Sequence, residues 1–393
     1  MRRTLLVVVG AIATTMFVGA CTGDSDETPT ATEAVTATAA ATESSTPTPE
    51  ATATPEAASA DAGQMLAALL HIDSAGFHAM DEALNGDAPV IDTAWLGRAT
   101  RARIAAEAIT WPSELQAAAD AFVEQVAALE AALDADDAVA AAEPAAGAHE
   151  AQHDLSHDAY EAIEAAPASA SDAGAILAAL VLIDGVGFHG IDEGLNGAAP
   201  AIDPSWLGDV TSARMAAQTV AWPGESQAAA NAFVEAALSL EAALEADDAS
   251  AAAEPAIAAH ETQHDLSHVA YDLLATMSGS ADSPGAILAA MYLIDSAGFH
   301  GMDETLNSAG AVIDTSWIGA TIRARVAAET VAWPDDLQAA ADAFIAAATA
   351  LEAALDVDDV VAAAEPAVAA HETQHDLSHD AYAHLGGGAG GGH

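Results

Sequence analysis

Residues 149–157 read HEAQHDLSH, and nearly the same nine residues, HETQHDLSH, return at 260–268 and at 371–379. A second string of the form GFHxxDE recurs in step with the first, at 76–82, 187–193 and 298–304. Both strings repeat at a constant spacing of 111 residues. Self-similarity at a fixed period is the signature of a repeated structural unit, so the chain contains three copies of one unit.

The three units cover about 62–172, 173–283 and 284–385, and a glycine-rich tail comes after them at 386–393. The rare aromatic residues keep the same register, since each unit contains two tryptophans and two phenylalanines. Apolar residues recur at helical spacing, and no segment alternates as a strand would. The sequence therefore predicts an all-α protein.

Each unit is predicted to form four helices. In the first unit we expect them over about 62–84, 92–111, 113–134 and 136–165. Asn85-Gly86 should end the first helix, and Pro144 should kink the fourth. Four helices joined by short loops are typical of an antiparallel four-helix bundle, so the expected architecture is three tandem four-helix bundles.

The charge balance excludes one large class of partner. The 393 residues include 60 acids, eight arginines and no lysine, which gives a formal net charge of −52. Nucleic-acid binding depends on clustered cations that face phosphates, and this chain cannot supply them. The same charge would repel the folded part from an anionic membrane surface.

The first 61 residues are expected to place the protein outside the cytoplasm. Residues 1–20 have the basic start, apolar run and small residues of an export signal, and Val18-Gly19-Ala20-Cys21 resembles a bacterial lipobox. By that resemblance, Cys21 carries a lipid that anchors the chain to the cell membrane; a plain secretory signal or an uncleaved anchor is the alternative. Residues 21–61, rich in Thr, Ala and Pro, should be a disordered stalk.

Twelve of the fifteen histidines divide four per unit. On a helical wheel of the fourth helix of the first unit, His149, His153 and His157 share one face, which we expect to point into the bundle. On the first helix, Asp81 and His78 lie at the border of the apolar face. Imidazoles that face carboxylates inside a bundle are typical of metal sites. The predicted ligands are His78, Asp81, His149, His153 and His157 in the first unit; His189, Asp192, His260, His264 and His268 in the second; and His300, Asp303, His371, His375 and His379 in the third.

Three arginines recur at the same spacing and are expected to support these sites. We predict that they pair with the acids in the middle of the first helices, as Asp73 with Arg103, Asp184 with Arg214, and Asp295 with Arg325. Exposed arginines without a partner are the alternative. The histidines themselves could instead be hydrogen-bonded core residues or a pH sensor. The HExxH string at 149–153 also matches zinc peptidases, but this unit offers no strand to bind a peptide.

The string GFHAMDEAL at 76–84 resembles the GxHxxE motif of the imelysin-like families, which include iron-uptake lipoproteins of the EfeO/EfeM type. The resemblance implies an exported helical metal-binding domain, with His78 and Asp81, His189 and Asp192, and His300 and Asp303 as ligands. The third motif position is Asp here rather than Glu, and the HExxHDxxH helix is not a feature of that family.

The sequence as a whole predicts an extracytoplasmic, lipid-anchored protein that captures transition-metal ions for uptake or storage. Nitrogen and oxygen ligands suit Fe, Cu or Zn alike. An uptake role would require a membrane metal transporter as partner. The alternatives are a structural surface lipoprotein with helical spacers, and a metal-dependent oxidase at the same sites; no residue is assigned a catalytic role.

Overall fold

The computed structural model describes residues 61–166 and 172–387, in which it contains fifteen α-helices and no strand. The prediction of an all-α protein is confirmed. The export signal, the lipobox cysteine Cys21 and the stalk up to residue 60 lie outside the described residues.

Each repeat contributes five helices in the same order. Repeat 1 contains α1 (Ala62–Ser74), α2 (Phe77–Leu84), α3 (Trp95–Ala108), α4 (Gln116–Asp134) and α5 (Ala138–Ala165). Repeat 2 contains α6 (Ala173–Gly185), α7 (Phe188–Asn196), α8 (Trp206–Thr219), α9 (Ser226–Glu245) and α10 (Ala249–Ala275). Repeat 3 contains α11 (Pro284–Ser296), α12 (Phe299–Leu306), α13 (Ser316–Thr330), α14 (Gln338–Asp356) and α15 (Val360–Leu385).

The first predicted helix is wrong in one respect, because the segment 62–84 forms two helices rather than one. Gly76 separates α1 from α2 with a φ of +79°, and the equivalent glycines Gly187 and Gly298 have φ values of +72° and +80°. This left-handed conformation is open to glycine without a steric cost and is disfavoured for other residues. The break redirects α2 so that it packs on α5.

Within a repeat, the four longer helices pack as neighbours in chain order, and the short second helix packs on the fifth. The α1 helix contacts α3, α3 contacts α4, α4 contacts α5, and α5 returns to α1 and α2. Two phenylalanines mark the centre of each core: the rings of Phe77 and Phe122 meet edge to face with centroids 5.5 Å apart. The equivalent pairs are Phe188–Phe233 and Phe299–Phe344, at 5.4 Å and 5.5 Å.

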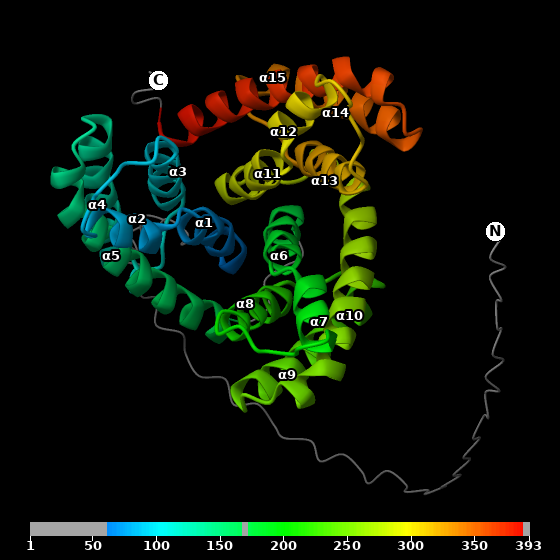
Figure 1. Ribbon diagram of the computed structural model, residues 1–393. Helices are drawn as coiled ribbons and strands as arrows, with labels where there is room; N and C mark the ends of the chain where they lie inside the picture. The colour runs from blue at the N-terminus through cyan, green and yellow to red at the C-terminus, as the bar shows by residue number, and fades with distance from the viewer. Residues whose placement is uncertain (1–60, 167–171, 388–393) are drawn as a thin grey trace, which may run out of the picture. The chain divides into compact units, whose positions relative to one another are not determined.

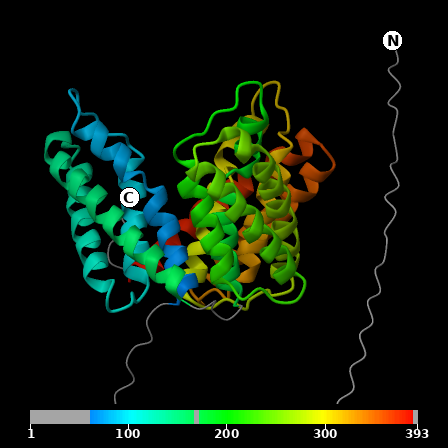
Figure 2. The same ribbon diagram turned by 90° about the horizontal axis from the view of Figure 1, so that it is seen from below.

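The three repeats share one continuous core. The first helices, α1, α6 and α11, contact one another, and Figure 1 shows them around the centre of the three repeats, which Figure 2 shows from below. Glycines allow the close approach: a Cβ atom added to Gly63 would lie 2.6 Å from Cβ of Ala175, and one added to Gly174 would lie 2.9 Å from Cβ of Ala286. Gly285 closes the circle, because its added Cβ would lie 2.8 Å from Cα of Gln64.

Further contacts join each repeat to the next. The fifth helix of every repeat reaches the third helix of a neighbouring repeat, in the pairs α5–α8, α10–α13 and α15–α3. The third pair connects the last repeat to the first. The described repeats therefore contact one another in a closed circle.

Within residues 61–166 and 172–387, two helical stretches are long and apolar enough to cross a membrane by length and composition, namely Ala173–Asn196 and Gln338–Asp356. The first spans α6 and α7, and 61% of its most apolar window is buried. Its apolar character is therefore explained by packing against α1 and α11. The second is the alanine-rich α14, whose Phe344 and Leu351 face the core.

Candidate metal centre

The centre of the candidate site is a contact between α2 and α5. The Nδ1 atom of His149 lies 3.0 Å from Oδ2 of Asp81, and both side chains are partly buried. The contact recurs in the other repeats, at 3.0 Å for His260 and Asp192 and at 2.9 Å for His371 and Asp303. Because the same histidine–aspartate contact forms in all three repeats, it is a property of the repeated fold.

Asparagine at the end of α2 holds the carboxylate in place. The Nδ2 group of Asn85 donates to Oδ1 of Asp81 over 2.8 Å and to the carbonyl oxygen of Ala142 on α5 over 2.9 Å. Asn196 and Asn307 make the equivalent bonds. The sequence predicts Asn85 only as the end of a helix, but the recurrence of an asparagine four residues after each of these aspartates is a signal for the bond.

A second imidazole lies beside the first. The ring centroids of His78 and His149 are 4.8 Å apart, and the corresponding distances are 5.0 Å for His189–His260 and 4.8 Å for His300–His371. His78 is exposed, and its Nε2 atom lies 3.5 Å from a carboxylate oxygen of Glu82. The left-handed turn at Gly76 brings His78 to this position, because it directs α2 across α5.

The pairing of His149 with Asp81 has a chemical consequence. A carboxylate accepts a hydrogen bond from Nδ1–H, which leaves Nε2 as the atom with a free lone pair. Metal-ligating histidines are oriented by carboxylates in this way, and the carboxylate raises the basicity of the ligand. The geometry therefore lets Asp81 orient the ring of His149 and leaves Nε2 of His149 as its free nitrogen.

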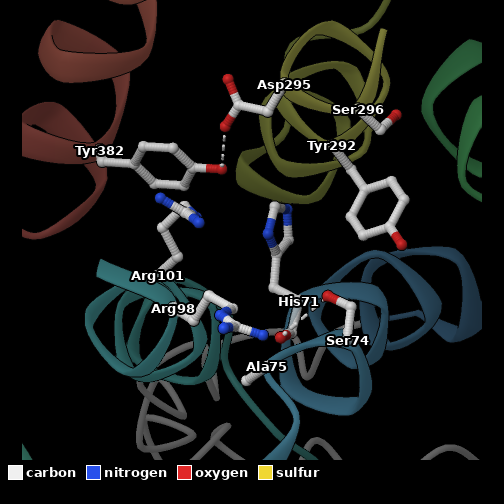
Figure 3. A pocket seen from close by; sticks show the side chains of 9 residues that line it. All are labelled: His71, Ser74, Ala75, Arg98, Arg101, Tyr292, Asp295, Ser296 and Tyr382. Carbon is white, nitrogen blue, oxygen red and sulfur yellow. Dashed lines mark hydrogen bonds between the residues drawn. The ribbon is translucent and has the colours of Figure 1, made fainter. Parts of the chain in front are cut away.

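The acids at the C-terminal ends of the first helices α1, α6 and α11 have partners other than the predicted arginines. Asp73 accepts hydrogen bonds from Ser156 over 2.6 Å, from Gln152 over 2.8 Å and from the hydroxyl of Tyr160 over 3.0 Å. In repeat 2, Asp184 accepts from Gln263 and Ser267, and in repeat 3, Asp295 accepts from Gln374, Ser378 and Tyr382. Figure 3 shows the bond from Tyr382 to Asp295.

Protein packed around Asp73 raises the pKa of its carboxyl group, and the three hydrogen bonds oppose that rise. Water still reaches the side chain. The glutamine and serine of the HEAQHDLSH string are thus explained: they bind the acid of the first helix and leave the histidines free for another role.

The predicted pairs between these acids and Arg103, Arg214 and Arg325 are wrong. Arg103 lies 2.9 Å from Glu130 and 2.7 Å from Glu107 instead. Arg214 pairs with Glu241, and Arg325 pairs with Glu352 and Glu329. Each arginine therefore links the third helix of its repeat to the fourth. A helical wheel could not show this, because the partner lies on another helix.

Two of the three histidines of the fourth predicted helix do not face the interior. His153 and His157 are exposed, as are His264, His268, His375 and His379. The buried face of α5 is formed by Ala141, Ala145, Ala148, Leu155, Ser156, Ala159 and Ile163. Alanines occur on every side of this helix, so they do not define an apolar direction, and its one valine, Val139, is 81% exposed.

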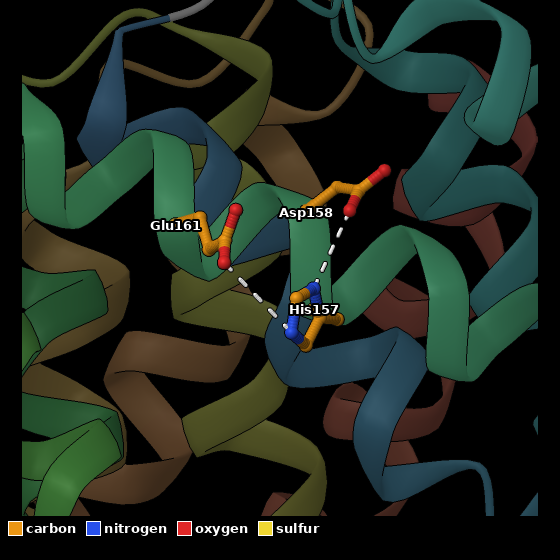
Figure 4. A group of neighbouring side chains, drawn as sticks. All are labelled: His157, Asp158 and Glu161. Atoms are coloured by element: carbon orange, nitrogen blue, oxygen red, sulfur yellow. Dashed lines mark hydrogen bonds and ion pairs between the residues drawn. The ribbon is translucent and has the colours of Figure 1, made fainter.

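The predicted five-ligand set is consequently not gathered around one point. His149, Asp81 and His78 meet, His153 comes one turn later along α5, and His157 lies a further turn away. In the described residues, one group has three donor atoms within 4.8 Å of one another, namely His157, Asp158 and Glu161 (Figure 4). All three are exposed, and Val269 and Ala383 replace two of them in the other repeats.

Searches against protein-family models, curated proteins and solved structures found no match to this chain. The resemblance to the imelysin-like families stays a prediction.

Proposed function

We propose that this chain is an extracytoplasmic, lipid-anchored protein that binds transition-metal ions at three equivalent sites. The observation that carries the proposal is the His149–Asp81 contact with His78 beside it, which recurs within 0.2 Å in all three repeats. In this proposal each repeat is a four-helix bundle whose first helix is broken, and the bundles are arranged in tandem along the chain.

The ligands in the first repeat are Nε2 of His149 together with the imidazoles of His78 and His153, while Asp81 holds Nδ1 of His149. The rings of the equivalent His260 and His264 in repeat 2 already lie 6.1 Å apart. His78 and His153 are exposed, and exposed side chains change rotamer within picoseconds to nanoseconds, so they can close on a cation without moving the backbone. His157 lies one turn beyond this set.

Imidazole donors suit Fe, Cu and Zn, and the exposed position of the sites suits capture from the surroundings. The large negative charge of the chain raises the local concentration of cations around it. The role we propose is capture for storage or for delivery to a membrane metal transporter.

A structural surface lipoprotein is the second candidate. The observation that favours it is the bond between His149 and Asp81, which satisfies both groups without a metal. In that case the histidines stabilise the helical repeats, which act as a spacer, and the stalk holds this spacer away from the membrane.

Two triple variants separate the two candidates. His149, His260 and His371 changed together to alanine should abolish the rise in melting temperature that the metal gives the wild-type chain. The matched control changes His157, His268 and His379 to alanine, which lie on the same helices but outside the proposed set, and should retain that rise. If no metal among Fe, Cu and Zn raises the melting temperature of the wild-type chain, the metal proposal is wrong.

A milder variant tests the orienting role of the carboxylate. Changing Asp81, Asp192 and Asp303 to asparagine keeps the size of the side chain but removes the charge that orients each histidine. Loss of such a partner typically lowers metal affinity by about 10–100-fold. A direct ligand role for the carboxylates would give a complete loss of binding, and the structural candidate would give no change in metal content.

A further inference from the structure

A cavity of about 200 Å³ lies between repeats 1 and 3, and it is partly open to solvent. Its lining includes Arg98 and Arg101 from α3, His71 from α1, Tyr292 and Asp295 from α11, and Tyr382 from α15 (Figure 3). The metal centres contribute no residue to it.

The cavity gathers cations in a chain that has very few. Residues 61–387 contain six arginines and no lysine. Three of those arginines pair with glutamates, and two of the other three line this one cavity. Such a concentration of positive charge stands out against a net charge of −52.

The charge of Arg101 is not balanced by a direct contact. In the part of the chain that the structure describes, Arg101 makes no hydrogen bond and no ion pair within 4.0 Å. The nearest acid to Arg98 is Asp92, at 4.0 Å. The five donors of a guanidinium group are suited to planar oxyanions, which they bind through two parallel hydrogen bonds.

The acid of the cavity does not compete for these arginines. Asp295 accepts hydrogen bonds from Gln374, Ser378 and Tyr382, so its oxygens are occupied by neutral donors. The remaining wall is aromatic: the ring of His71 meets those of Tyr292 and Tyr382 edge to face, at 5.5 Å and 5.9 Å. One side of the cavity therefore carries the two arginines, and the other carries aromatic rings and the hydrogen-bonded carboxylate of Asp295.

The equivalent positions in the other repeats do not repeat this arrangement. Asp209 and Ser212 of repeat 2 take the places of Arg98 and Arg101, and Ala320 and Arg323 take them in repeat 3. A cavity of about 220 Å³ between repeats 2 and 3 is lined by Arg323 alone among the arginines. The pair of cations is thus specific to the cavity between repeats 1 and 3.

We propose that this cavity binds a small oxyanion, a phosphate or a carboxylate, through Arg98 and Arg101. The volume limits the occupant, because about 200 Å³ is less than the 300–1,000 Å³ of sites for drug-sized ligands. The ligand is therefore an ion of a few non-hydrogen atoms or the end of a larger molecule.

The test is calorimetric titration of the metal-free full chain with inorganic phosphate and, separately, with acetate. Removal of metal first keeps the result independent of the metal proposal. We expect saturable binding of one equivalent of at least one ion, and a loss of affinity of about tenfold or more in Arg101→Ser, the residue found in repeat 2. The double variant Arg98→Ala/Arg101→Ser should show no binding.

Arg323→Ser is the matched control, because it removes the same charge from the cavity between repeats 2 and 3 and should leave the affinity unchanged. Circular dichroism melts establish that each variant is folded at the temperature of the titration. Two outcomes overturn the proposal: neither ion binds the wild-type chain at concentrations up to about 10 mM, or binding survives in the double variant. Equal loss in Arg101→Ser and Arg323→Ser would also overturn it, since that result indicates general charge attraction.

Discussion

His71 departs from the repeat, and the departure places a buried titratable group between two repeats. The equivalent residues in the other repeats are Leu182 and Leu293. His71 is buried, and its Nε2 atom lies 2.9 Å from the carbonyl oxygen of Leu288, within hydrogen-bond distance. Burial lowers the pKa of His71 from 6.5 to about 4. Asp295 opposes this shift, and Arg101 adds to it. The folded chain thus holds a neutral histidine between repeats 1 and 3.

This pKa predicts a dependence of stability on pH. The unfolded chain takes up a proton near pH 6.5, but the folded chain resists it until about pH 4, so the stabilisation is complete above pH 6.5 and is lost as the pH falls toward 4. The loss amounts to about 3 kcal/mol, at about 1.4 kcal/mol per unit. His71→Leu should remove that part of the pH dependence. Urea unfolding of both metal-free proteins at pH 7 and pH 4.5 measures the difference, and parallel losses in the two proteins would contradict the assignment.

At the scale of elements, the short helices α2, α7 and α12 each supply one histidine and one aspartate of a proposed site. The direction of each helix depends on the left-handed glycine that precedes it. The site in repeat 2 offers a clean comparison, because neither Gly187 nor Gly190 has an atom within 4 Å of the place where a Cβ would lie. The two glycines differ in conformation: Gly187 has a φ of +72°, and Gly190 lies within α7. Any difference between their alanine variants therefore comes from the backbone.

We expect Gly187→Ala to lower the free energy of unfolding by about 1–2 kcal/mol, the cost of a left-handed alanine. Gly190→Ala should raise it by about 0.5–1 kcal/mol, because alanine is the better helix former. Chemical denaturation of the two variants and the wild type provides the measurement. Equal effects of the two substitutions would mean that the turn at Gly187 is not held in the left-handed conformation.

The elements also show how far sequence reasoning reaches. The repeats and the all-helical class are predictable from period and spacing, and the joint recurrence of the GFHAMDE and HEAQHDLSH strings indicates that both belong to one site. The break at Gly76 was missed because the apolar periodicity runs through it from α1 into α2. The predicted buried face of α5 is wrong because an alanine-rich helix has methyl groups on all sides. Only larger apolar residues such as Leu155 and Ile163 indicate which face is buried. Partners on other helices, such as Glu130 for Arg103, depend on packing that spacing does not encode.

At the scale of the whole described chain, the three repeats depend on a common core rather than on three separate ones. The first helices are buried on nearly all sides, as α6 shows with ten buried residues out of thirteen. Each of these helices is covered by its own repeat and by the two others. The repeats should therefore unfold together.

Gly285→Ala tests this shared core. The new methyl group would lie 2.8 Å from Cα of Gln64, a backbone atom that cannot move without shifting α1, and overpacking of this kind costs about 1–3 kcal/mol. Gly208→Ala is the control, since Gly208 lies within α8 and has open space around it. We expect one cooperative thermal transition in all three proteins, with a lower melting temperature for Gly285→Ala alone. Separate transitions for the repeats in the wild type would contradict a shared core.

Metal binding at three equivalent sites is best tested by the number of ions bound per chain. Equilibrium dialysis of untagged, metal-free protein against Fe, Cu or Zn at pH 7, with metal analysis of the dialysed protein, gives that number. We predict three equivalents, with an affinity that falls as the pH is lowered from about 7 to 5, because imidazole must be neutral to bind. One equivalent that disappears in His157→Ala would place the metal at the exposed group of repeat 1 instead, and no binding above background would contradict the metal proposal altogether.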